Sequence, residues 1–197
     1  MGFKAALSVM TGLVIGLAGC AGTNFSRPGP ELLKNGETTY AQVVAKMGRP
    51  YQEGTVVKNE QTVKTVSYAY ASVGGKPLHE GVTAARAIGL YFHNDTLVGH
   101  EFISSWAEDH TNFDDGKVSQ IVKGKATRAD VTRLFGEPGG YYVYPLVKTQ
   151  GAEAAVYAYL EVRGFTPFRK VLIVTFDGGG IVTDVEFTSA GRKGDGS

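Results

Sequence analysis

The chain has 197 residues, and its 20 basic and 19 acidic side chains give a formal net charge of +1 at pH 7. Hydrophobic residues make up 43% of the chain and charged residues 20%, which is an ordinary balance for a globular protein. Because this balance implies no basic face, nucleic acid is not expected as a partner, and the 27 glycines indicate many turns.

The first 19 residues have the pattern of a signal peptide. Lys4 supplies a positive charge, and the mostly apolar run 5–17 is roughly 13 residues long, shorter than the ~20 that a membrane-spanning helix needs. The run leads into Leu17-Ala18-Gly19-Cys20, and Cys20 is the only cysteine of the chain. This end resembles a bacterial lipobox, which implies cleavage before Cys20 and its lipidation. The alternative is a soluble secreted protein whose cysteine happens to follow the signal.

The residues after Cys20 bear on where the protein is held. Several acyl chains on one residue form a firm membrane tether without a transmembrane helix. Ala21, rather than Asp, stands after the cysteine, and by resemblance to enterobacterial lipoproteins this implies an outer-membrane anchor facing the periplasm. Residues 20–30 are rich in glycine, proline and polar residues, so we expect a flexible tether.

Two segments of the chain repeat each other. Residues 36–50 and 124–138, 88 positions apart (124 − 36), share Gly, Thr, Ala, Val, Gly and Pro at identical internal positions. Each copy predicts a short helix with defined ends. A capping-box spacing marks its start, an apolar stripe its buried face, and a glycine and a proline its end. Such short helices are marginal alone and must dock on other elements. The start and stop residues are Thr39, Gln42, Gly48 and Pro50 in the first copy and Thr127, Asp130, Gly136 and Pro138 in the second.

Strand-like segments follow each copy. They are rich in β-branched and aromatic residues, and Asn94-Asp95 and Asp177–Gly180 are turn signals between them. The pattern predicts an α+β fold of two tandem units, each with short helices packed on a small antiparallel β-sheet. The predicted strands are 62–73, 87–93 and 97–104 in the first unit and 154–163, 169–176 and 181–189 in the second.

The two units are expected to be separated by an acidic connector that contains Trp106, Phe113 and Asp114. One interpretation is a linker whose aromatic residues pin it to the sheets. The other is a partner-binding strip, which makes these three residues the candidate protein-binding site. The predicted divisions are a signal peptide 1–19, a tether 20–30, a first unit 31–105, the connector 106–118, a second unit 119–190 and a disordered tail 191–197.

The motif that runs from Leu33-Lys34-Asn35-Gly36 to Pro50, followed by antiparallel strands, resembles the SmpA/OmlA, or BamE-like, family of outer-membrane lipoproteins. The second copy begins Val122-Lys123-Gly124, with one residue fewer before the glycine. A tandem pair of such units is also similar to the β-lactamase-inhibitor-protein architecture. The first resemblance implies an accessory or scaffold role in outer-membrane or envelope assembly. The second implies a module that occludes a periplasmic or cell-wall enzyme.

The sequence contains no motif that indicates a catalytic site. The four histidines lack metal-ligand spacing, no Gly-x-Ser-x-Gly motif is present, and the one cysteine is assigned to lipid. Asp177–Gly180 precedes a strand-like run rather than a helix, so a hairpin turn is favoured over a phosphate cradle. We therefore expect a non-enzymatic protein with no cofactor, no metal and no small-molecule substrate. Its expected partners are the membrane, through the lipid, and an envelope protein.

Overall fold

The computed structural model describes residues 22–191 of the chain. The predicted signal peptide and Cys20 therefore lie outside the described residues, as does the predicted tail beyond Gly191. The helices are η1 (Pro30–Leu32), α1 (Tyr40–Met47), η2 (Asp115–Gln120) and α2 (Arg128–Phe135). The strands are β1 (Gln52–Lys58), β2 (Gln61–Ser72), β3 (Ala84–His93), β4 (Thr96–Ser104), β5 (Gly140–Val143), β6 (Glu153–Arg163), β7 (Thr166–Phe176) and β8 (Val182–Gly191).

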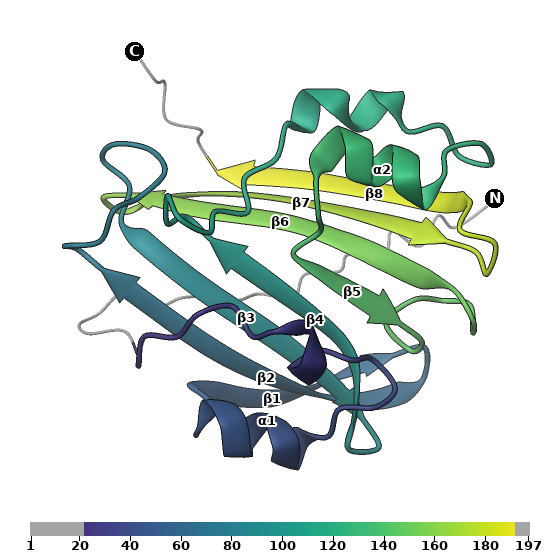
Figure 1. The fold of residues 1–197 in the computed structure, drawn as a ribbon, viewed down its shortest axis with the longest axis horizontal. Helices are drawn as coiled ribbons and strands as arrows, with labels where there is room; N and C mark the ends of the chain where they lie inside the picture. The colour runs from purple at the N-terminus through teal and green to yellow at the C-terminus, as the bar shows by residue number, and fades with distance from the viewer. Residues whose placement is uncertain (1–21, 192–197) are drawn as a thin grey trace, which may run out of the picture.

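All eight strands form one sheet in chain order from β1 to β8, and every neighbouring pair is antiparallel (Figure 1). The predicted fold class was wrong. The protein is predominantly β with short helices, not an α+β pair of separate helix-on-sheet units. The two halves join because β5 pairs with β4, with Glu101 opposite Gly140 and Gly99 opposite Tyr142.

Glycines make this junction possible. A Cβ on Gly140 would lie 1.8 Å from the carbonyl oxygen of His100, and a Cβ on Gly139 would lie 2.5 Å from that of Phe102. A side chain at either position would push β5 away from β4. β5 has only four residues, too few for the alternation of apolar and polar residues to reveal it, and it is not among the strands predicted from the sequence. This missed strand merges the two expected sheets into one.

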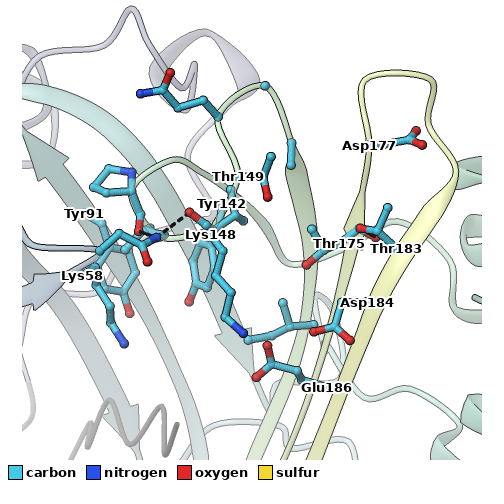
Figure 2. Close-up of a pocket in the computed structure, with 18 of the residues that line it drawn as sticks. Lys58, Tyr91, Tyr142, Lys148, Thr149, Thr175, Asp177, Thr183, Asp184 and Glu186 are labelled. Atoms are coloured by element: carbon cyan, nitrogen blue, oxygen red, sulfur yellow. Dashed lines mark hydrogen bonds between the residues drawn. The ribbon is translucent and has the colours of Figure 1, made fainter. Parts of the chain in front are cut away.

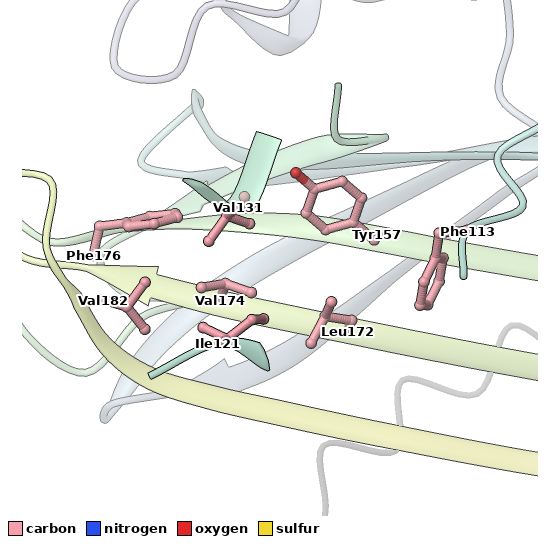
Figure 3. Packing of buried hydrophobic residues seen from close by; sticks show 9 residues of the cluster. Phe113, Ile121, Val131, Tyr157, Leu172, Val174, Phe176 and Val182 are labelled. Atoms are coloured by element: carbon pink, nitrogen blue, oxygen red, sulfur yellow. The ribbon is translucent and has the colours of Figure 1, made fainter. Parts of the chain in front are cut away.

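Both helices pack on the same side of the sheet, which we call the helix face (Figure 1). Val43 of α1 and Val131 of α2 are fully buried, each against the strands of its own half. Figure 3 shows Val131 among the side chains of β6 to β8. Cross-strand partners continue this face through Val66, Leu90, His100, Tyr141, Ala155 and Val174. The opposite side, which we call the open face, carries Thr65, Tyr91, Gly99, Tyr142, Ala154 and Thr175.

The predicted helix boundaries are confirmed in both copies. Each helix begins with the expected capping box and ends at a glycine with φ 78°. A tyrosine of the following strands donates a hydrogen bond to that glycine's carbonyl oxygen in each copy, from Tyr68 to Gly48 at 2.8 Å and from Tyr157 to Gly136 at 3.0 Å. The repeated sequence therefore encodes a repeated helix-to-sheet attachment.

The segment that precedes α1 lies against the helix face and contacts both halves. Phe25 packs edge-to-face on Tyr68 of the first half, with ring centroids 6.5 Å apart. Arg27 donates a hydrogen bond to the carbonyl oxygen of Pro138 in the second half at 2.9 Å. For the described residues 22–30, these contacts differ from the flexible tether that we expected. An aromatic ring and a guanidinium group make two of the contacts, and composition alone does not reveal them.

The connections between strands alternate between the two ends of the sheet, because the strands follow one another antiparallel in chain order. The β1–β2 turn, the β5–β6 loop and the β7–β8 turn lie at one end, which we call the pocket end. The β2–β3 and β6–β7 connections and the end of β8 lie at the other, which we call the terminal end. The N-terminal segment begins near the terminal end, at the left of Figure 1.

Candidate functional site

A cavity of about 680 Å³ lies on the open face at the pocket end. It is bounded by the sheet, by the loop 144–152 between β5 and β6, and by the turns at the tips of two hairpins (Figure 2). We call this cavity the trough. The aromatic, aliphatic and charged side chains that line it include those of Tyr91, Tyr142, Leu146, Lys148, Ile173 and Glu186.

The wall of the trough is pinned across the two halves of the protein. Asn59, in the β1–β2 turn, has φ 46°, a conformation that asparagine tolerates better than most residues. Its Nδ2 donates to the carbonyl oxygens of Pro145 at 2.9 Å and Val147 at 2.8 Å (Figure 2). Val147 is itself buried in the same apolar cluster as the floor of the trough. The loop 144–152 is therefore held in place before any ligand arrives.

Two tyrosines form the floor. The rings of Tyr91 and Tyr142 meet edge-to-face with centroids 5.4 Å apart. Both hydroxyls donate to the buried carboxylate of Glu101, at 3.3 Å and 2.8 Å. Burial, together with the charge of Glu101, raises the pKa of both tyrosines far above their ordinary value. Both hydroxyls thus keep their protons, and the carboxylate has two donors beneath a fixed aromatic surface.

Charged side chains of both signs surround this floor. Asp184 forms an ion pair with Lys123, and the hydrogen bond from that lysine lowers the pKa of Asp184. Lys58, Lys148 and Glu186 have no ion-pair partner within 4 Å among residues 22–191. Figure 2 shows the Lys148 side chain directed toward Asp184 and Glu186. The trough therefore offers charges of both signs to a ligand.

The arrangement is suited to binding. Histidine and cysteine are absent from the described residues that line the trough. Across residues 22–191, no three metal-ligating side chains cluster in a way that could hold a metal ion. The aromatic floor and the aliphatic side chains offer apolar surface, and the charged side chains can fix the orientation of a bound group.

The residues that the sequence singled out do not line the trough. Trp106 stacks on Tyr70 with ring centroids 6.0 Å apart, and the guanidinium carbon of Arg86 lies 4.7 Å from the centroid of its ring. Arg86 also pairs with Glu108 at 2.7 Å. Trp106 thus helps to attach the connector to the sheet at the terminal end.

Phe113 and Asp114 also have structural contacts. Phe113 is only 7% exposed and packs edge-to-face against Phe135 and Tyr157, both with centroids 6.1 Å away. Asp114 precedes η2 and accepts a hydrogen bond from the backbone N–H of Gly116 at 3.1 Å. Burial leaves the Phe113 ring little surface for a partner, and the protein-binding role of these residues stays a prediction. Cys20 lies outside the described residues.

Sequence reasoning missed the residues of the trough because they come from separate strands and loops. Tyr91 was placed within a predicted strand, but nothing in its neighbourhood distinguishes a floor residue from a core residue. The one available signal was Tyr141-Tyr142, which follows two glycines and precedes Pro145. Two adjacent aromatic residues between turn-forming residues indicate a short strand with a ring on each face.

Comparison with known proteins assigns no family. No protein-family model matches the chain, and no curated protein matches it either. Among solved structures, a Streptococcus mutans protein described as a candidate β-lactamase inhibitor protein is similar, with 11% identity and a TM-score of 0.39. The similarity covers 77% of this chain and 82% of that one. A structural overlap this low carries no conclusion about function. Within residues 22–191, no helix has the length and apolar character to cross a bilayer.

Proposed function

We propose that this protein is a lipid-anchored, non-enzymatic protein-binding module of the bacterial envelope, and that the trough holds a segment of its partner. The trough is the observation that supports this proposal. Its lining comes from both halves of the sheet, from Lys58 and Tyr91 in the first to Tyr142, Ile173 and Glu186 in the second. A site that crosses several strands suits an extended segment of another protein.

The chemistry of the lining defines the segment that would bind. Apolar side chains of the segment would cover the Tyr142 ring and the side chains of Leu146 and Ile173. A basic side chain would lie near Glu186, and an acidic one near Lys58. Because the wall is pinned by Asn59, binding would order little additional chain, which limits its entropic cost.

The anchor proposed at Cys20 places this module at the outer membrane, facing the periplasm. Confinement to the membrane raises the effective concentration of the module toward any partner held there. This setting fits an accessory or scaffold role in outer-membrane or envelope assembly. The alternative is occlusion of a periplasmic or cell-wall enzyme, in which the bound segment would belong to the target's active-site region.

Site-specific photocrosslinking in living cells tests the binding site. A photoreactive residue at Thr149, on the exposed loop beside the trough, is compared with one at Lys125, which is exposed and does not line the trough. We expect a discrete protein adduct from position 149 and none from position 125. Equal adducts from both positions, or none from either, would contradict the proposed site. An adduct with a β-barrel assembly component supports the assembly role, and one with a cell-wall enzyme supports occlusion.

The lipid anchor is tested separately. The mature protein should carry acyl chains on Cys20, and Cys20→Ser should release it from the membrane fraction. A wild-type protein whose intact mass shows no acyl chains would refute the anchor, whatever the crosslinking result.

A further inference from the structure

We infer that the terminal end of the sheet rests on the lipid bilayer, with the side chains of Val73 and Phe165 at the membrane surface. In this orientation the trough, at the opposite end, points away from the membrane. The inference rests on the lipid anchor proposed at Cys20 and adds to it a defined orientation.

The described residues begin close in sequence to the anchor proposed at Cys20. Residues 20–30, if free, could reach roughly 36 Å, because an extended chain spans at most about 3.6 Å per residue. That length would allow any orientation. Gly22, however, is already part of the described structure, and Cys20 is only two residues away. Two residues of extended chain span at most about 7 Å, which limits how far the proposed anchor can be from Gly22.

Gly22 is held at the terminal end. A Cβ on Gly22 would lie 2.1 Å from the carbonyl oxygen of Ala69, so its backbone passes directly against β2. Ala69 stands three residues before the end of this strand at Ser72. The following residues are fixed as well, because Arg86 donates a hydrogen bond to the carbonyl oxygen of Phe25 at 2.8 Å. The first described residues after the proposed anchor are thus held at the terminal end.

The same end presents the most exposed large apolar side chains of the described residues. Val73 is 100% exposed and Phe165 is 97% exposed. They lie in the β2–β3 and β6–β7 connections, which Arg163 ties together by donating to the carbonyl oxygen of Glu80 at 2.8 Å. Exposing such apolar side chains to water is energetically unfavourable, whereas the membrane interface accommodates them. Gly22, the described residue that follows the proposed anchor in the sequence, and the two exposed apolar side chains therefore belong to the same end of the sheet.

A fluorescence experiment on the lipidated full chain tests this orientation. Lipid occupies the sulfur of Cys20, the only native cysteine, so one engineered cysteine is the only free thiol. Gly74→Cys and Thr166→Cys place a polarity-sensitive dye beside Val73 and Phe165, and a Cβ on Gly74 has its nearest neighbour 4.0 Å away. Thr149→Cys, beside the trough, is the matched control. The labelled proteins are inserted into phosphatidylethanolamine–phosphatidylglycerol vesicles with and without nitroxide-labelled lipids.

We expect a blue-shifted emission and strong quenching by nitroxide lipids at positions 74 and 166, and neither effect at position 149. The double substitution Val73→Ser with Phe165→Ser should reduce the quenching at positions 74 and 166. If the protein carries acyl chains but position 149 is quenched as strongly as the other two, the orientation is wrong and the anchor stands. If mass spectrometry finds no acyl chains, the anchor fails and the inference fails with it.

Discussion

His100 makes the stability of this protein sensitive to acid. The imidazole is 4% exposed on the helix face at the junction of the two halves, and its Nδ1 is buried without a hydrogen-bond partner. Burial, with a smaller contribution from the positive charge of Arg27, lowers the pKa of His100 from 6.5 to about 4. The unfolded chain therefore binds a proton at a higher pH than the folded protein does.

The sign and size of the effect follow from this difference. Near pH 7 both states are neutral at this residue, so His100 adds no pH dependence there. As the pH falls below 6.5 the unfolded state gains a proton that the folded state takes up only near pH 4. Since one pKa unit corresponds to 1.36 kcal/mol, the folded protein should lose about 3 kcal/mol of unfolding free energy across this window and no more below it.

Urea unfolding of the wild type and of His100→Gln measures this loss. Other groups titrate over the same range, so the quantity of interest is the difference between the two proteins at about pH 7 and about pH 4. We expect the wild type to lose about 3 kcal/mol more than the variant, whatever their relative stabilities at neutral pH. Two parallel pH profiles would refute the reasoning about His100.

Three further substitutions test the construction of the fold. Gly140→Ala should lower the free energy of unfolding in urea by about 2 to 3 kcal/mol, because the new Cβ clashes with β4. Gly178→Ala, in open space, should change it little. Equal losses would contradict the tight junction. Arg27→Ala should accelerate chymotrypsin cleavage near Phe25 by releasing the N-terminal segment, and Arg49→Ala should not. Unchanged cleavage would mean that this segment is not held by Arg27. Asn59→Ala should lower the free energy of unfolding by about 1 to 2 kcal/mol and increase the rate of amide hydrogen exchange in loop 144–152. An unchanged exchange rate would show that other contacts hold the loop.

The sequence was most informative where local rules decide the structure. The capping boxes at Thr39 and Thr127 follow from residue types three positions apart, and both formed as predicted. The hairpin turn at Asn94-Asp95 was also confirmed, with φ values of 49° and 64°. These features depend only on neighbouring residues, so a single sequence contains what is needed to predict them.

Longer-range features were missed. The joining of two expected sheets depends on β5 and on the close approach of Gly140 to His100, residues 40 positions apart (140 − 100). The docking of the N-terminal segment depends on Phe25 and Arg27, single residues within a composition typical of a linker. Local pattern cannot show which distant surface will receive such a side chain. The trough was missed for the same reason, since its lining is assembled from separate segments of the chain.

The binding of a partner protein in the trough is tested most directly by the yield of the photocrosslinked adduct from Thr149 in cells, measured with and without Glu186→Lys. Glu186 is exposed and lines the trough where a basic side chain of the partner is proposed to lie, so reversing its charge should abolish the adduct. The matched Glu137→Lys, at an exposed position outside the trough, should leave the adduct intact. An adduct of unchanged yield with Glu186→Lys would contradict the proposed binding site.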